Sequence, residues 1–330
     1  MIKNKDKILD ILIKTNDYVS GEKLSQFIGI SRTAIWKNIN RLKEEGYHID
    51  SVTNKGYRLL EEPSTLSESQ LMHDLKALGF THVQLDDTVD STNLEAKRRA
   101  DQVEGHGCFV AREQTSGRGR RGRYWSSPKD SGCYVSILLR PDIMPSDAAM
   151  VTLIAGLSLA KTLNQLYDIN AKIKWPNDII IQGKKVAGIL TEMSAEIERV
   201  NYLVIGIGLN VSQQAFSSEL SSIATSLEMA SNQGTIEFNR HEYIQTLITE
   251  FMHYIERFFQ IRDLSFIKKE YENLCLNVKG DIRVVGNKDS YIGIGQGITN
   301  QGELLVLTPA GDTMKVNSGE VSVRGIYGYV

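Results

Sequence analysis

The sequence predicts an α+β protein of 330 residues built from three successive units, and three observations lead to that prediction. Residues 1–63 hold three short amphipathic helical patterns followed by a strand–turn–strand pattern. Residues 64–273 combine apolar strands with long helices, as in a central mixed α/β sheet domain. Residues 274–330 contain short β segments separated by glycines, which is typical of a small barrel.

The first unit is expected to be a winged helix-turn-helix. Ser31 is a candidate cap for its third helix, which carries apolar residues at the i, i+4 and i+7 positions of a buried face: Ile35, Ile39 and Leu42. Two shorter helices and a hairpin complete the pattern, within residues 5–14, 20–28 and 47–60. A linker at residues 61–65, which contains Pro63, separates this unit from the next.

Charge is distributed unevenly along the chain. Residues 1–60 carry eleven Lys or Arg and seven Asp or Glu, a net charge of +4, whereas the whole chain stands at −2. A basic unit on an acidic body is typical of a protein in which one domain meets nucleic acid. The third helix of such a unit places its first turns in the major groove, so the DNA-binding candidates are Ser31, Arg32, Thr33, Trp36, Lys37 and, in the wing, Lys55. Two alternatives stay open: a winged helix that contacts only protein, and a Trp36 side chain that belongs to the core or an interface.

Residues 117–125, with the sequence GRGRRGRYW, form a cationic loop that folding alone does not require. Glycines let a backbone approach a ligand, and guanidinium groups match phosphate or carboxylate oxygens. The loop also satisfies the G-x-G-x-x-G dinucleotide pattern, but residues 124–128 do not begin the helix that this fingerprint needs. We therefore predict an anion-binding loop; a solvated basic loop and a nucleic-acid patch are the alternatives.

A predicted hairpin brings a lysine and a carboxylate to one surface. If residues 182–183 form a two-residue turn, Ile180 lies opposite Lys185, and side-chain alternation places Asp178 on the same face. A plain hairpin salt bridge is the alternative. In the next strand, Gly206 and Gly208 are expected to leave room for a ligand, unless they mark a bulge or tight packing.

Two segments match the capping-box pattern at helix starts, residues 67–70 and residues 92–95. Helix capping is therefore one explanation for Ser91 and Thr92. The three cysteines, Cys108, Cys133 and Cys275, form no metal or redox spacing, and no signal peptide is visible, so we expect a cytoplasmic protein. The apolar stretch 148–163 is too short to span a bilayer and is expected to be a buried helix.

Four motifs, in this order, resemble those of biotin–protein ligases: GRGRRGRYW at 117–125 with SP at 127–128, KWPND at 174–178, KVAGIL at 185–190, and GIGLN at 206–210. Together with the predicted helix-turn-helix, they resemble the two-function members of that family over nearly the entire chain. The resemblance implies a central ligase domain and an SH3-like C-terminal barrel. It implies that biotin is activated by ATP as biotinyl-5′-AMP and transferred to a lysine of a carrier domain.

The resemblance also implies roles for individual residues. Biotin is expected to contact Ser91, Thr92, Asn93, Gln114, Gly117, Arg118, Gly119, Arg120, Lys185 and Gly188. ATP is expected to contact Arg120, Arg121, Arg123, Trp125, Asn177, Lys185, Asn210 and Ala224. Catalysis is assigned to Lys185, Arg118 and Arg120, which would supply positive charge where two anions meet. Mg²⁺ is expected on the phosphates, and no metal site made by the protein is expected.

The partners implied by the resemblance are the biotin carboxyl carrier domains of acetyl-CoA carboxylase and pyruvate carboxylase, and operator DNA of biotin synthesis and uptake genes. Biotin would serve as substrate and as precursor of the corepressor, and the adenylate-bound chain would form a homodimer. No membrane partner is expected. Two rival hypotheses are a lipoate-type ligase on a related scaffold, and a regulator that senses an adenylated ligand without making it.

Overall fold

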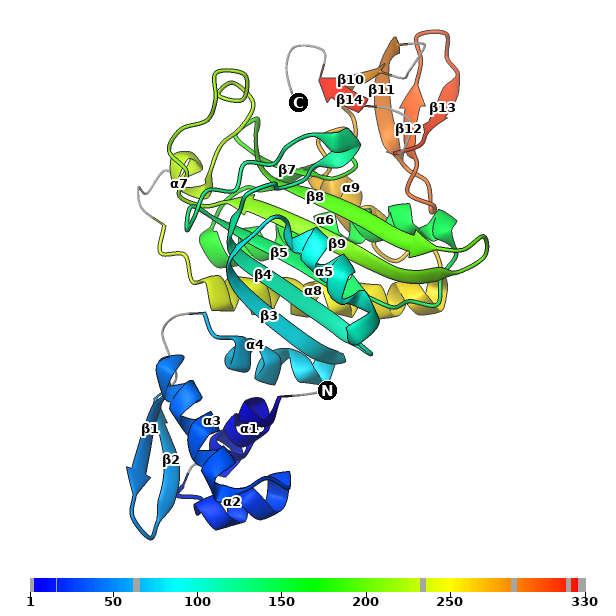
Figure 1. Ribbon diagram of the computed structural model, residues 1–330. Helices are drawn as coiled ribbons and strands as arrows, with labels where there is room; N and C mark the ends of the chain where they lie inside the picture. The colour runs from blue at the N-terminus through cyan, green and yellow to red at the C-terminus, as the bar shows by residue number, and fades with distance from the viewer. Residues whose placement is uncertain are drawn as a thin grey trace.

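The computed structural model describes residues 3–15, 17–61, 66–231, 236–285, 290–318 and 322–325. The chain forms a small N-terminal head, a central sheet with its helices, and a small C-terminal sheet (Figure 1). Residues 62–65, which include most of the predicted linker and the predicted boundary after residue 63, lie outside the described residues.

The head is a winged helix-turn-helix, as predicted. Its elements are α1 (Asn4–Thr15), α2 (Gly21–Ile28), α3 (Arg32–Glu44), β1 (His48–Val52) and β2 (Gly56–Glu61), and the two strands pair in an antiparallel hairpin. Ser31 caps α3, because its hydroxyl accepts a hydrogen bond from the Ala34 backbone N at 3.2 Å. The predicted core face of α3 is confirmed by its buried side chains, Ile35, Ile39 and Leu42.

The central unit is a seven-stranded mixed sheet with the strand order β3-β4-β5-β9-β8-β7-β6. Its strands are β3 (Phe80–Val89), β4 (His106–Gln114), β5 (Gly132–Leu139), β6 (Lys172–Lys174), β7 (Asp178–Ile181), β8 (Lys184–Ala195) and β9 (Val200–Asn210). β3 runs parallel to β4, and the other neighbours are antiparallel. Its helices are α4 (Glu68–Leu75), α5 (Thr92–Arg99), α6 (Ala148–Tyr167), α7 (Leu227–Ala230), α8 (Arg240–Ile261) and α9 (Lys268–Leu274).

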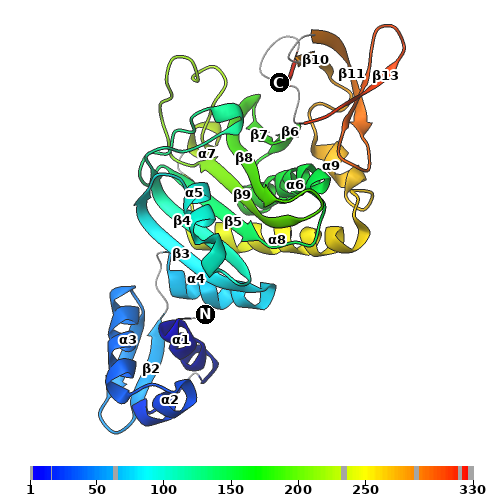
Figure 2. The same ribbon diagram turned by 45° about the vertical axis from the view of Figure 1, so that its right-hand side comes forward.

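Helices lie on both faces of this sheet. α6 and α8 cover one face, while α5 lies over β4 and β5 on the other (Figures 1 and 2). The alternation of side chains agrees, because Cys108 and Val110 join the core under α6 and α8, whereas Phe109 packs with Ala96 of α5 and with Ala100, the residue after it. The face under α6 and α8 holds the main core, and the face under α5 keeps open space beside that helix for a site.

The apolar segment around residues 148–163 belongs to a longer helix than expected. By length and composition alone, the helical segment Pro145–Tyr167 could cross a membrane. The expectation that the apolar segment at residues 148–163 is too short to do so was therefore wrong. It packs between the sheet and α8, and 72% of its most apolar window is buried within the protein. The prediction of a buried core helix is therefore confirmed.

The C-terminal unit is a five-stranded antiparallel sheet with the order β13-β12-β11-β10-β14, in keeping with the predicted small β unit. The strands are β10 (Asp281–Val285), β11 (Ser290–Ile298), β12 (Leu304–Leu307), β13 (Thr313–Val316) and β14 (Ser322–Gly325). Ile298 and Leu304 join the main core of the central unit, and the Trp175 indole N–H donates to the Gly302 carbonyl at 3.0 Å. The two units therefore share one core.

The head, by contrast, meets the central unit through polar groups. Asp10 of α1 lies 2.6 Å from both His73 Nδ1 of α4 and Nζ of Lys76, the residue after α4, and Ser69 donates to Asp6 at 2.8 Å. Burial alone would raise the pKa of Asp10, but the hydrogen bonds from Lys76 and His73 outweigh it and lower the pKa. The apolar core of the head is separate from the main core.

Candidate active site

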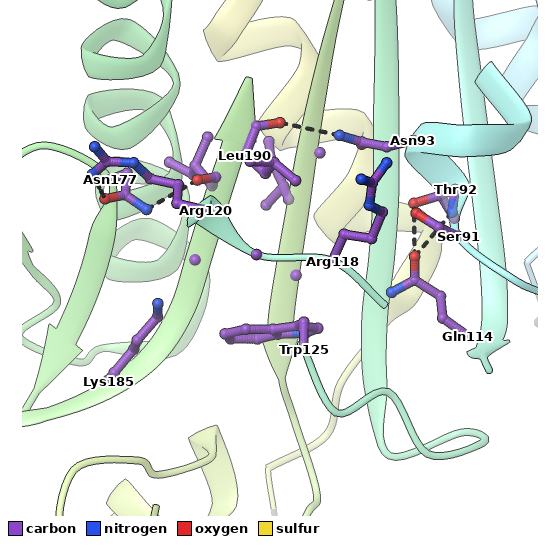
Figure 3. Close-up of a pocket in the computed structure, with 16 residues that line it drawn as sticks. Ser91, Thr92, Asn93, Gln114, Arg118, Arg120, Trp125, Asn177, Lys185 and Leu190 are labelled. Carbon is purple, nitrogen blue, oxygen red and sulfur yellow. Dashed lines mark hydrogen bonds between the residues drawn. The ribbon is translucent and has the colours of Figure 1, made fainter. Parts of the chain in front are cut away.

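One pocket opens on the α5 face of the central sheet and collects many of the predicted residues (Figure 3). It is lined by Ser91, Thr92, Asn93, Gln114, Arg118, Gly119, Arg120, Trp125, Asn177, Lys185, Gly188, Ile189, Leu190, Gly206, Ile207 and Gly208. These residues come from the start of α5, the end of β4, the arginine loop, the segment before β7, β8 and β9. Segments that are far apart in the sequence therefore meet at one site.

The pocket floor is made by two pairs of facing residues on β8 and β9. Gly188 lies opposite Gly208, and Leu190 lies opposite Gly206. A Cβ on Gly206 would come within 2.2 Å of Asn93 Oδ1, and one on Gly208 within 2.5 Å of the Trp125 indole nitrogen. Both glycines line the pocket, and the side chains of Asn93 and Trp125 pack against them, as the alternative of tight packing expects; their contact with a ligand stays a prediction.

One end of the pocket is a chain of hydrogen bonds among neutral side chains. Gln114 is held at both ends: its Oε1 accepts from the Thr92 backbone N at 2.9 Å, and its Nε2 donates to Ser127 Oγ at 2.8 Å. Ser136 Oγ, fully buried on β5, lies 2.7 Å from Thr92 Oγ1 and 2.6 Å from Asn93 Oδ1. Because each group is fixed by its neighbours, this end presents donors and acceptors in set directions.

The same contacts correct the predicted capping box at residues 92–95. α5 begins at Thr92 with Ser91 as its N-cap residue, but the Ser91 side chain makes no capping hydrogen bond. The Thr92 hydroxyl lies 3.2 Å from Gln114 Oε1, within the pocket chain, so it does not cap the helix either. At residues 67–70, by contrast, the predicted serine does cap its helix, because the Ser67 hydroxyl accepts a hydrogen bond from the Gln70 backbone N at 3.5 Å.

Two lysine contacts define the opposite end. Ile180 faces Lys185 across the hairpin, as predicted, and Gln182 and Gly183 form the turn with positive φ angles of 49° and 77°. Lys185 Nζ lies 2.6 Å from Asp178 Oδ1 and 5.2 Å from the centre of the Trp125 ring. A lysine ammonium thus stands at the pocket wall between a carboxylate and an indole.

The arginine loop contributes two guanidinium groups that point in different directions (Figure 3). Arg120 Nη1 donates to Asn177 Oδ1 at 2.8 Å, and its Nη2 contacts the Ser318 carbonyl of the C-terminal unit. Burial and the charges of the neighbouring arginines lower the pKa of Arg120, although Asp178 opposes them. Arg118 turns towards Asn93 and lies 3.6 Å from Glu192 Oε1.

Several predicted ligand contacts lie outside the pocket lining. Arg121 and Arg123 are exposed, because the loop turns outward at Arg121, which has a left-handed φ of 56°. Gly117 closes the loop, since its carbonyl accepts from the Trp125 backbone N at 2.9 Å. The remaining two are Asn210, whose amide donates to the Thr225 carbonyl at 3.0 Å, and Ala224, which bridges to the Lys185 backbone. Their proposed ligand contacts stay predictions.

Sequence reasoning missed three polar residues at this site: Ser127, Ser136 and Glu192. Ser136 is the single hydroxyl residue in the apolar run of β5 from Val135 to Leu139, and polarity on the pocket face of β5 and β8 was the signal that could have found Ser136 and Glu192. Within the described ranges, no three His, Cys, Asp or Glu residues gather closely enough to hold a metal ion.

The head presents its candidate DNA contacts at the surface. Trp36 is 55% exposed, so the alternative that it belongs to the core of the head was wrong. Arg32, on the first turn of α3, forms an exposed ion pair with Glu22 of α2 at 2.8 Å. In the wing, Lys55 Nζ lies 5.7 Å from the centre of the Tyr18 ring. The remaining candidates, Thr33 and Lys37, are also exposed on α3.

The pocket suits a ligand with a neutral polar group at one end and an anionic group at the other. Fold and site together define a class: an enzyme pocket for an anionic small molecule, joined to a nucleic-acid-binding head.

Family models match three segments: the Biotin/lipoate A/B protein ligase family at residues 85–210, an HTH domain at 4–58 and the Biotin protein ligase C terminal domain at 282–324.

Whole-chain comparisons agree with these segments. The Bifunctional ligase/repressor BirA of Bacillus subtilis is 38% identical over 93% of this chain and 94% of that protein. The protein of the same name from Escherichia coli is 31% identical over 95% of each chain. The structure of a biotin protein ligase from Aquifex aeolicus in complex with biotin and ATP matches with 30% identity and a TM-score of 0.65, over 74% of this chain and all of that chain. The chain belongs to the biotin protein ligase family, in the class that joins the ligase to a helix-turn-helix head.

Proposed function

We propose that the pocket carries out two successive reactions on biotin. In the first, a carboxylate oxygen of biotin attacks the α-phosphorus of ATP, a P–O bond forms, and pyrophosphate leaves. In the second, a neutral lysine amine of a carrier domain attacks the carbonyl carbon of biotinyl-5′-AMP. An amide forms, AMP leaves, and the nitrogen gives up its proton.

The observation that carries this proposal is the division of one pocket into a neutral end and a cationic end. The hydroxyls of Ser91 and Thr92 and the amide of Gln114 suit a ureido ring, which offers one acceptor and two donors. Arg120 and Lys185 stand at the other end, where a carboxylate must approach a phosphate, while Arg118 of the same loop reaches towards Asn93. Mg²⁺ would arrive on the phosphates of ATP, and Trp125 would flank the adenine.

The test is to incubate the full-length protein with ATP, Mg²⁺ and either biotin or lipoate. We expect pyrophosphate release with biotin, together with a bound product that has the mass of biotinyl-AMP. Release that depends on lipoate would favour the rival ligase. Binding without pyrophosphate release would favour the regulator that only senses an adenylated ligand.

We infer that the head makes the chain a repressor of biotin synthesis and uptake genes, with biotinyl-AMP as corepressor. The net charge of +4 on residues 1–60 and the exposed first turns of α3 support DNA binding. The adenylate-bound chain would dimerise, so that two heads bind a palindromic operator. Its acceptors would be the carrier domains of acetyl-CoA carboxylase and pyruvate carboxylase, in the cytoplasm.

We also propose unit boundaries at residues 1–63, 64–273 and 274–330. The separate apolar core of the head supports the first boundary. The second boundary divides units that share a core, so we expect the C-terminal unit to depend on the central one for its stability.

A further inference from the structure

Glu192 lies at the edge of the pocket, on β8. It follows Leu190 of the pocket floor by two residues, so its side chain lies on the same face of the sheet. That side chain is 19% exposed, which is low for a carboxylate, and it faces Val204 across the strand pair. A carboxylate at this position needs a physical reason, because the ligand proposed for the pocket is itself an anion.

Two hydrogen-bond donors and one further cation surround the Glu192 carboxylate. Lys97 Nζ lies 2.6 Å from Oε1, and Asn93 Nδ2 donates to Oε2 at 2.8 Å. The third is Arg118, whose Nη1 lies 3.6 Å from Oε1. Burial alone would raise the pKa of Glu192, but the hydrogen bonds from Lys97 and Asn93 and the two nearby cations outweigh it. The net effect lowers the pKa, so the group is ionised at neutral pH.

These contacts differ in how easily they can be exchanged. The Lys97 and Asn93 bonds are short and both come from α5, so they hold the carboxylate in place. Arg118 belongs to the glycine-rich loop, its side chain is 44% exposed, and its contact is the longest of the three. Arg118 is therefore the partner that can move from Glu192 to a ligand while Glu192 stays in position.

We propose that Glu192 is a positioning residue that holds Arg118 beside the ligand-free pocket and yields it to the anionic oxygens of the ligand; this inference rests on the function proposed above. Arg118 must leave one carboxylate to meet another, so the contact with Glu192 weakens biotin binding by the free energy of that exchange. The same contact recaptures Arg118 when the ligand departs. Glu192 thus tunes how firmly the arginine loop holds an anion.

The test compares biotin with biotinamide, which keeps the ureido ring and lacks the carboxylate charge. Binding of each ligand to the full-length protein is measured by calorimetry. Glu192→Gln should tighten biotin by about two- to fivefold, the range of a partly exposed ion pair, and leave biotinamide unchanged. The glutamine can still accept from Asn93, and thermal unfolding checks that the fold persists.

Three further variants separate the contact from a general change in charge. Glu196→Gln, in the exposed turn after β8, makes the same change in net charge and should leave biotin affinity unchanged. Lys97→Gln removes the nearer cation and strengthens the hold of Glu192 on Arg118, so biotin should bind about two- to fivefold more weakly. The double variant Lys97→Gln/Glu192→Gln has the parent's charge, yet it should still bind biotin more tightly than the parent.

The possible outcomes are distinct. A Glu192→Gln protein that binds biotin no more tightly, or that tightens biotinamide equally, overturns the inference. So does a double variant that returns to the parental affinity, because that result indicates a long-range charge effect. If Glu192→Gln does not fold, Lys97→Gln decides alone: weaker biotin binding with unchanged biotinamide binding supports the inference, and any other result overturns it. A parent protein that fails to bind biotin refutes the proposed function instead.

Discussion

The ligase pocket and the DNA-binding head hold their candidate residues in opposite ways. In the pocket, Thr92 and Gln114 are buried and bond to each other, with Ser136 behind them. In the head, Trp36 is 55% exposed, and the Arg32 side chain is 69% exposed and pairs with a carboxylate on the surface. The pocket is thus organised in advance for a small ligand, whereas the head is arranged for a partner that brings its own charges.

The largest effect is expected where charge meets the reacting atoms. Lys185→Ala should slow adenylate formation by at least about 100-fold, because a fixed charge in a closed site stabilises the transition state strongly. Pyrophosphate release with biotin and ATP measures this. Lys184→Ala is the matched control, because Lys184 Nζ contacts the Ser221 carbonyl at 3.1 Å, outside the pocket lining, and its loss should leave the rate near the parental value. Near-parental release from Lys185→Ala would remove that residue from the chemistry.

The next effect tests whether the neutral end is as rigid as its hydrogen bonds indicate. Gly206→Ala places a methyl group 2.2 Å from Asn93 Oδ1, so Asn93 must shift and disturb its neighbours. Biotin affinity should fall about ten- to a hundredfold, as for other overpacked sites. Gly156→Ala on α6, whose new methyl group would meet its nearest atoms at 3.8 Å, should bind biotin like the parent. Equal biotin affinity in both variants would show a pocket that adapts.

In the head, substitutions are expected to cause smaller losses, which are losses of operator affinity and depend on the salt concentration. Lys37→Ala should weaken operator binding and reduce the slope of log affinity against log salt by about one, the loss of one phosphate contact. Ligase activity should stay unchanged. Lys43→Ala, at the other end of α3, serves as control, because its ammonium donates to Ser51 Oγ at 2.9 Å. An unchanged salt slope in Lys37→Ala would show that Lys37 makes no phosphate contact.

The smallest expected effect is an increase in operator affinity. Glu22→Gln removes the carboxylate that pairs with Arg32 at 2.8 Å and leaves the guanidinium free for DNA. Because the pair is exposed, operator affinity should rise only about twofold. Titration at low salt, where such effects are largest, gives the measurement. Weaker binding would mean that Glu22 holds Arg32 in its DNA-contacting position.

Local patterns in the sequence were enough to predict the elements and one register. The spacing of Ile35, Ile39 and Leu42 identified the core face of α3. The two-residue turn at Gln182 and Gly183 predicted the pairing of Ile180 with Lys185, but not the register shift that follows between Ile179 and Ile180. Both depend on residues close together in the chain, where geometry leaves few choices.

Contacts between distant segments were harder to predict. Gly206 and Gly208 accommodate Asn93 and Trp125, which lie 113 and 83 residues earlier in the chain, and no local pattern predicts that packing. Glu192 looked like an ordinary strand residue, because its three partners come from α5 and the arginine loop. The direction of each loop arginine also depends on backbone angles that the composition of a glycine-rich loop does not fix.

The central claim is that chemistry in the pocket controls the head. Operator binding by gel shift and dimer fraction by sedimentation, measured on the same samples with and without biotin and ATP, test it directly in the parent and in Lys185→Ala. Operator affinity and dimer fraction should rise together in the parent and should not respond in the variant, which cannot make the adenylate. If both quantities ignore biotin and ATP in the parent, or if the variant responds as the parent does, the pocket does not control the head.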